Sequence, residues 1–123
     1  MATLNELIRK SDLVKRAYDF AKKAHAGQKR KNGEPYINHP VAAAEAIVEW
    51  GLDEPTIAAA LLHDTVEDTG KTLTDVKKEF GEEVAFLVDG VTKIGKVRYP
   101  GVEAKVENLR KFILYLSQDI PVI

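Results

Sequence analysis

The chain has 123 residues and no cysteine, and 30% of its residues are charged, for a formal net charge of −1. This length fits one domain with its own core, so we assign residues 1–123 to a single domain. The near-neutral charge excludes a protein whose overall field attracts DNA, and the missing cysteines exclude a disulfide framework and a thiol nucleophile. The chain shows no membrane-spanning apolar run and no signal-peptide pattern, so we expect a cytoplasmic protein that is not bound to a membrane.

Helical patterns follow one another along the chain, and no segment shows the sustained alternation of a strand. Most of the expected helices begin at a capping residue or a proline, and several end near a glycine. The six expected helices run from Ser11 and Asp12 to about His25, from Pro40 to about Trp50, from Asp53 or Glu54 to Gly70, from Thr72 to Phe80, from Gly81 towards Ile94, and from about Val102 to Ser117.

The third expected helix carries four side chains that bind metals or transfer protons within six residues. They are His63, Asp64, Glu67 and Asp68. At about 100° per residue they share one face of a continuous helix, opposite an apolar face with Leu62 and Val66, and small Ala60 leaves room above it for an ion. Acids in the last turns of a helix oppose its dipole, which favours a bound cation over a merely solvated acidic face. We therefore predict a metal-centred hydrolytic site.

The segment 27–38 reads as a loop that ends just before His39. Its three consecutive cations, Lys29-Arg30-Lys31, suit a phosphate-rich ligand, although a short basic run is more often a solvated surface. Two interpretations of His39 stay open: a hydrogen-bonding residue at the start of a helix, or an imidazole ligand on rigid backbone. A site that draws on both His39 and His63 would suit Mn²⁺, Fe²⁺, Co²⁺ or Zn²⁺ rather than Ca²⁺.

Two aromatic rings are assigned to the scaffold of the protein. We interpret His25, near the end of the first expected helix, as a structural residue or an outer neighbour of the metal site. We assign Trp50 to the core, together with the Phe and Leu residues at helical spacing.

Four strings occur in order between about residue 15 and the C-terminus. They are Ala-His-Ala-Gly-Gln-Lys-Arg-Lys-Asn-Gly-Glu-Pro-Tyr-Ile-Asn-His-Pro, Leu-Leu-His-Asp-Thr-Val-Glu-Asp-Thr, Phe-Gly-Glu-Glu-Val and Leu-Val-Asp-Gly-Val-Thr-Lys-Ile-Gly-Lys. Together they resemble the N-terminal HD-type hydrolase domain of the RelA/SpoT family. The resemblance implies an all-α HD-domain helical bundle. It also implies a 3′-pyrophosphohydrolase that converts the stringent-response alarmone (p)ppGpp to GDP or GTP and pyrophosphate.

The resemblance also implies a role for each residue that matches the family's motifs. The implied metal ligands are His39, His63 and Asp64, for Mn²⁺ or another divalent transition metal. The implied acidic pair at the attacking water is Glu67 and Asp68. The implied nucleotide-binding loop contains Arg30, Lys31, Asn32 and Tyr36. A guanosine polyphosphate is then the expected partner.

The chain departs from the family pattern near its C-terminus. In the family, an Asp within Leu-Ala-Asp-Arg-Leu-His-Asn completes the metal site, and that string is absent up to Ile123; Pro121 also stands where Arg is common. We therefore expect a C-terminally incomplete bundle that is weakly active or inactive. Its uncovered apolar strip should drive self-association or a rearranged last helix. The strip consists of Ile113, Leu116, Ile120 and Ile123.

Three functional readings remain open from the sequence. The first is a manganese-dependent alarmone hydrolase, either standalone or part of a bifunctional (p)ppGpp synthetase/hydrolase. The second is a catalytically silent HD module that binds nucleotide or metal, or has a regulatory role. The third is an HD phosphohydrolase for another nucleotide.

Overall fold

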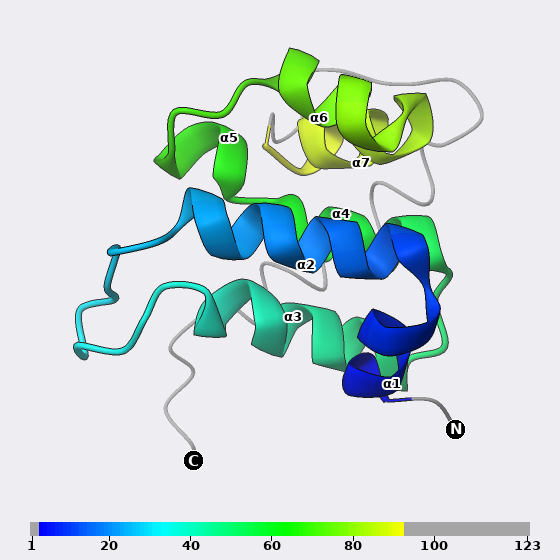
Figure 1. Ribbon diagram of the computed structural model, residues 1–123, viewed down its shortest axis with the longest axis horizontal. Coiled ribbons are helices and arrows are strands. Elements are labelled where there is room, and N and C mark those ends of the chain that lie inside the picture. The colour runs from blue at the N-terminus through cyan, green and yellow to red at the C-terminus, as the bar shows by residue number, and fades with distance from the viewer. Residues whose placement is uncertain (1–2, 93–123) are drawn as a thin grey trace.

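The computed structural model describes residues 3–92, without the side chains of Glu67, Val91 and Thr92. Within these residues the chain is all helix and loop, with one isolated β-bridge between Lys29 and Pro35, which confirms the all-α fold class (Figure 1). The helices are α1 Leu4–Lys10, α2 Asp12–Ala24, α3 Asn38–Glu49, α4 Glu54–Leu62, α5 Thr65–Asp68, α6 Leu73–Phe80 and α7 Glu82–Thr92. None of the described helices is long and apolar enough to span a membrane.

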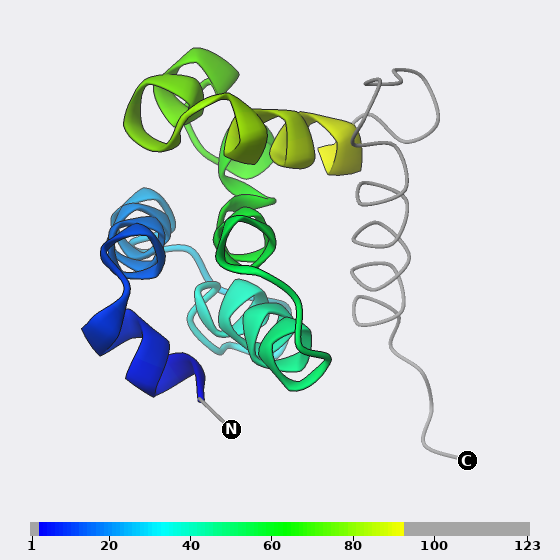
Figure 2. The ribbon, with the colours of Figure 1, turned by 90° about the vertical axis from the view of Figure 1, so that its right-hand side faces the viewer.

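Helix α4 is the centre of the described structure. It packs against α2, α3 and α7, and Figure 2 shows it almost end-on, with α2 beside it, α3 below it and α7 passing above it. All residues from Thr56 to Leu62 are buried, so the expected division of this helix into an apolar and a polar face is wrong. A helix that neighbours cover on every side has to be apolar all round. Ala58 and Ala60, expected on opposite faces, are both 0% exposed.

The expected continuous helix over 54–70 is also wrong, because it breaks between Leu62 and Thr65. His63 Nδ1 donates to the Ala60 carbonyl at 2.6 Å, and Thr65 Oγ1 donates to the Leu62 carbonyl at 2.8 Å. These side chains satisfy carbonyls that the next helical turn would otherwise use, so they favour the end of α4 over its continuation. The predicted shared face of His63, Asp64, Glu67 and Asp68 required one continuous helix, so this prediction does not hold across the break.

Local capping signals predict several helix boundaries well. Ser11 caps α2, and Thr72 and Asp75 form the expected capping box of α6. Helix α3 begins at Asn38, two residues before the expected start, so that Pro40 lies in its first turn. The sequence analysis missed α1, a seven-residue helix with one buried residue, Leu4. The end expected near Ile94 and the helix expected over 102–117 lie outside the described residues.

The assignment of Trp50 to the core is wrong, because its side chain is 44% exposed. Trp50 is the C-cap residue of α3 and precedes Gly51, which leaves the helix with a φ of +73°. Helical spacing therefore does not carry its side chain onto the buried face of α3.

We predict that Ser11→Ala lowers the free energy of unfolding by about 1–2 kcal/mol, because a cap and a partly buried hydrogen bond are lost together. Ser11 Oγ accepts from the Val14 amide at 3.2 Å and donates to Glu54 Oε1 at 2.6 Å, which joins the starts of α2 and α4. Urea unfolding followed by circular dichroism measures the change. Thr3→Ala, which removes the exposed cap of α1, is the control and should cost less. Equal costs would contradict the interpretation of Ser11 as a link between two helices.

Candidate metal centre

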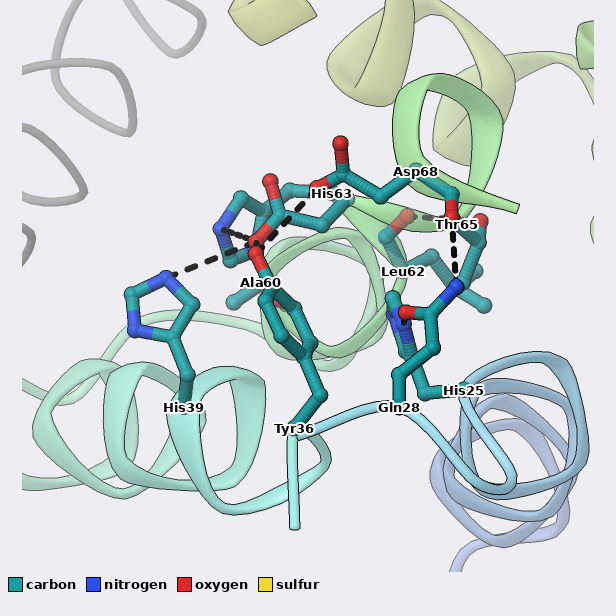
Figure 3. Close-up of polar contacts among 10 residues, drawn as sticks. His25, Gln28, Tyr36, His39, Ala60, Leu62, His63, Thr65 and Asp68 are labelled. Carbon is teal, nitrogen blue, oxygen red and sulfur yellow. Dashed lines mark hydrogen bonds and ion pairs between the residues drawn. The ribbon is translucent and has the colours of Figure 1, made fainter. Parts of the chain in front are cut away.

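Three metal-ligand side chains meet where α3 begins and α4 ends. One potential ligand atom from each of His39, His63 and Asp64 lies within 4.8 Å of the others. Asp64 Oδ2 is 3.1 Å from His63 Nε2 and 3.4 Å from His39 Nε2 (Figure 3). The structure thus brings together the three residues that the sequence analysis named as ligands, although they belong to separate helical segments.

The orientation of His63 suits a metal ligand. The Ala60 carbonyl can only accept a hydrogen bond, so Nδ1 of His63 carries the proton and Nε2 faces Asp64. Metal-binding imidazoles are commonly held in this way by a hydrogen bond from the other ring nitrogen. Two imidazole nitrogens and one carboxylate oxygen also form a donor set typical of divalent transition metals. Ala60 contributes to the site through its backbone carbonyl. The expected contribution was a different one, namely that its small side chain leaves room for an ion.

The charges of the three groups depend on one another. Burial acts to raise the pKa of Asp64, but hydrogen bonds from His63 and Tyr36 and the charges of the imidazoles outweigh burial and lower it to about 2. Burial acts to lower the pKa of His63, but its hydrogen bond to Asp64 and the charge of that carboxylate raise it overall. Burial and the neighbouring His63 lower the pKa of His39. Asp64 therefore stays ionised and supplies negative charge to the centre.

Tyr36 connects the metal-ligand cluster to Asp68 of α5. Its hydroxyl donates to Asp64 Oδ2 at 2.8 Å and lies 3.2 Å from Asp68 Oδ2. Burial, together with the hydrogen bond to Asp64 and the charges of both carboxylates, raises the pKa of Tyr36 far above its ordinary value. The phenol stays protonated, so it can serve as a donor to these carboxylates.

The loop over residues 27–37, here called the basic loop, lines a cavity together with His39 and Asp64 of the metal-ligand cluster. This cavity measures about 560 Å³, and the residues that line it are Lys29, Arg30, Lys31, Asn32, Tyr36, His39 and Asp64. The loop folds back on itself through hydrogen bonds from the Arg30 amide to the Glu34 carbonyl (2.8 Å) and from the Gly33 amide to the Arg30 carbonyl (2.9 Å). Gly33 has a φ of +90°, in the region that favours glycine, so it allows the tight turn.

The four predicted loop residues all border this cavity, and so does Lys29, the first of the three consecutive cations. Asp68 lies beside the cavity, because its carboxylate contacts Tyr36, which lines the cavity. The side chain of Glu67 lies outside the described part of the structure, so its predicted role stays a prediction. The sequence analysis gave no role to Gln28, whose side chain reaches α5, because no motif marks a lone glutamine as a structural link.

Similarity to known proteins identifies the family. The sequence pattern of the HD domain matches residues 17–123. The chain belongs to the HD domain family. This assignment agrees with the all-α fold and with the adjacent His63 and Asp64 at its centre.

Curated relatives confirm the resemblance to the RelA/SpoT family. A guanosine-3′,5′-bis(diphosphate) 3′-pyrophosphohydrolase of Aquifex aeolicus is 56% identical over 89% of this chain, which spans 16% of that protein. The bifunctional (p)ppGpp synthase/hydrolase SpoT of Escherichia coli K12 is 48% identical over 98% of this chain, which spans 18% of that protein. A GTP pyrophosphokinase of Streptomyces coelicolor is 48% identical over 86% of the chain, or 12% of its own length. The chain thus spans less than a fifth of the length of these relatives.

A solved structure of a metazoan ortholog of SpoT, described as hydrolysing ppGpp, has the same helical arrangement. It is 31% identical, with a TM-score of 0.68, and the match covers 86% of this chain and 66% of that one. The HD domain of this chain is therefore similar to known hydrolases in both sequence and fold.

We predict that the contribution of the Asp64–His63 pair to the stability of the metal-free protein is greatest between pH 3.8 and 6.5, the ordinary pKa values of the two groups. The folded pKa of Asp64 is lowered, so its contribution is present above pH 3.8 and is lost as the pH falls towards about 2. The folded pKa of His63 is raised, so its contribution is present below pH 6.5 and is lost as the pH rises through the folded pKa.

The measurement is the difference in unfolding free energy between the wild type and Asp64→Asn as a function of pH, in the presence of a chelator. Asp19→Asn, at an exposed position on α2, is the control and should show no such maximum. A difference that does not vary with pH would contradict the coupling of the two groups.

Proposed function

We propose that the HD domain of this chain hydrolyses guanosine polyphosphates of the (p)ppGpp class and releases pyrophosphate from the 3′ side. The reaction would use a divalent transition metal, for which we propose Mn²⁺. The observation that carries this proposal is the shared cavity, in which His39 and Asp64 of the metal-ligand cluster lie with the three consecutive cations of the loop. The names of the Aquifex and Escherichia relatives support the choice of substrate.

The metal-ligand set of the proposed enzyme is His39, His63 and Asp64. A divalent cation bound there would polarise the scissile phosphate and lower the pKa of a coordinated water. Asp64 provides the negative charge, and the hydrogen bond between His63 and the Ala60 carbonyl keeps Nε2 directed into the centre.

The other residues of the cavity divide the remaining tasks. Arg30 and Lys31 bind the polyphosphate, because guanidinium and ammonium groups form charge-assisted hydrogen bonds to phosphate oxygens. Asn32 and Tyr36 border the nucleoside. Glu67 and Asp68 orient and deprotonate the attacking water as general bases.

The second candidate function is an HD module that binds nucleotide without hydrolysing it. The observation in its favour is that some similar relatives carry the name GTP pyrophosphokinase, which refers to synthesis and not to hydrolysis. The two functions differ in one measurable outcome: both bind the nucleotide, and only the first releases pyrophosphate.

We predict that Asp64→Asn lowers the affinity of the protein for Mn²⁺ by at least about 10-fold, because the amide removes the negative charge of the ligand set. Titration calorimetry with Mn²⁺ alone measures this affinity without the need for activity. Asp19→Asn is again the matched carboxylate-to-amide control, since Asp19 is exposed and lies outside the cluster. Equal Mn²⁺ affinity in the wild type and Asp64→Asn would disprove the metal centre.

We predict that Asp68→Asn and Glu67→Gln each lower the kcat of pyrophosphate release by about 100-fold or more, with a small change in KM, because they remove proton handling. Arg30→Ala should instead raise KM by about 10-fold, because it removes a phosphate contact. The assay measures Mn²⁺-dependent release of pyrophosphate from guanosine tetraphosphate, in a protein that continues past Ile123 through the Leu-Ala-Asp-Arg-Leu-His-Asn string of the family.

Lys15→Ala, which removes an exposed cation outside the cavity, is the control for general charge effects on this reaction. Full activity of both carboxylate variants would refute their assignment. Nucleotide binding without any pyrophosphate release by the wild type would favour the second candidate function.

A further inference from the structure

Gln28 lies at the base of the basic loop and uses all four of its polar atoms. Its backbone amide donates to the His25 carbonyl at 2.9 Å, and its backbone carbonyl accepts from the Tyr36 amide at 2.9 Å. Its side-chain Oε1 lies 2.9 Å from His25 Nδ1, and its Nε2 donates to the Asp68 carbonyl at 2.6 Å. Gln28 therefore contacts the end of α2, the far side of the loop and α5 at the same time (Figure 3).

The hydrogen-bond partners fix the direction of this link. The Asp68 carbonyl can only accept, so the amide nitrogen of Gln28 faces α5 and its oxygen faces His25. His25 must then donate from Nδ1. Its ring is 2% exposed, so it is held in place within the protein.

His25 also contacts the second connection between the loop and α5. Its ring stacks on Tyr36 with centroids 4.7 Å apart and 28° between the planes. The hydroxyl of Tyr36 in turn contacts Asp64 and Asp68. The buried imidazole of His25 thus contacts both Gln28 and Tyr36. These two residues join the basic loop to α5.

Helix α5 depends on such contacts, because four residues are too few to form a stable helix alone. Asp68 is its last residue, so the bond from Gln28 holds the end of α5 that carries the proposed base. Neither Gln28 nor His25 lines the cavity, and their effect on chemistry would therefore act through Asp68.

We propose that Gln28, oriented by His25, is a positioning residue that holds Asp68 of α5 at a fixed place relative to the basic loop. The proposal rests on the hydrolytic function proposed above. It assigns the loop a second task beyond phosphate binding: the same segment that binds the anion also sets the position of the general base.

Two variants test the link from its two sides. Gln28→Glu keeps an acceptor for His25 but replaces the donor to the Asp68 carbonyl with a carboxylate oxygen, which that carbonyl repels. His25→Phe keeps a ring against Tyr36 but removes the Nδ1 donor. Asn5→Asp on α1 is the matched amide-to-acid control, because it is exposed and far from the loop in sequence.

The first measurement is steady-state pyrophosphate release by the protein that continues past Ile123, as in the assay above. We expect both variants to lower kcat by about 10-fold, since small displacements of a catalytic group reduce rate steeply. Their KM and Mn²⁺ affinity should stay within about 3-fold of the wild type, because the phosphate-binding and metal-ligand side chains are unchanged. A rise in KM with unchanged kcat, or unchanged values of both, would overturn the proposal.

The second measurement is amide hydrogen exchange in the metal-free protein, which does not require activity. The Asp68 amide donates to the Asp64 carbonyl at 2.9 Å, so its exchange rate reports the order of α5. We expect exchange of this amide to accelerate by about 10-fold in Gln28→Glu and to stay unchanged in Asn5→Asp, while amides of α4 keep their protection.

The two measurements separate the two proposals. Unchanged exchange at Asp68 in Gln28→Glu would overturn the positioning role whatever the activity. Accelerated exchange at Asp68, combined with no pyrophosphate release by the wild type, would retain the structural link and reject the hydrolytic function on which its catalytic meaning rests.

Discussion

The candidate site depends on the burial of α4 on all sides and on the place where this helix ends. Neighbouring helices cover Thr56–Leu62, so the backbone here has little freedom to shift. Its last carbonyls accept hydrogen bonds from the side chains of His63 and Thr65, which ends the helix and orients the His63 ring in one step. The adjacent Asp64 then takes its place at the start of α5. The packing of α4 therefore restricts the positions of His63 and Asp64, two of the three candidate ligands.

Local signals in the sequence predicted much of the fold, and most of the errors arose where a local pattern allows more than one outcome. Caps at Ser11 and Thr72 were predicted correctly, because each depends on residues within one helical turn. The break after Leu62 was missed, since it requires side chains to bond carbonyls that a continuous helix would use equally well. Burial of α4 on all sides agrees with its own composition, because every residue from Ile57 to Leu62 is apolar. It was missed because the expected helix was extended past Leu62 into the polar residues. Trp50 was misplaced because periodicity does not reveal where a helix stops.

The candidate site was predicted more completely than the fold because its residues occur in ordered motifs. The structure brings His39, His63 and Asp64 together. It also places the three cations of the basic loop at the cavity that His39 and Asp64 line. The supporting contacts were not predictable in the same way. Gln28 and His25 have ordinary residue types at unremarkable spacing, and their importance appears only when the loop folds back against α5. Motifs thus identify chemical groups, whereas the residues that orient these groups depend on the three-dimensional arrangement.

The distribution of charge in the cavity gives a physical reason to expect a cation in the site. Asp64 is ionised, with a pKa of about 2, and it borders the same cavity as Arg30 and Lys31. A phosphate group drawn in by the loop would approach this carboxylate, and two like charges about 4 Å apart repel by about 4 kcal/mol near a protein surface. The loop cations attract the phosphate and offset part of this repulsion, but the negative charge of the carboxylate stays in place. A divalent ion held by the carboxylate and the two imidazoles would turn this repulsive end of the cavity into an attractive one. An anionic ligand and a metal ion should therefore bind this site cooperatively.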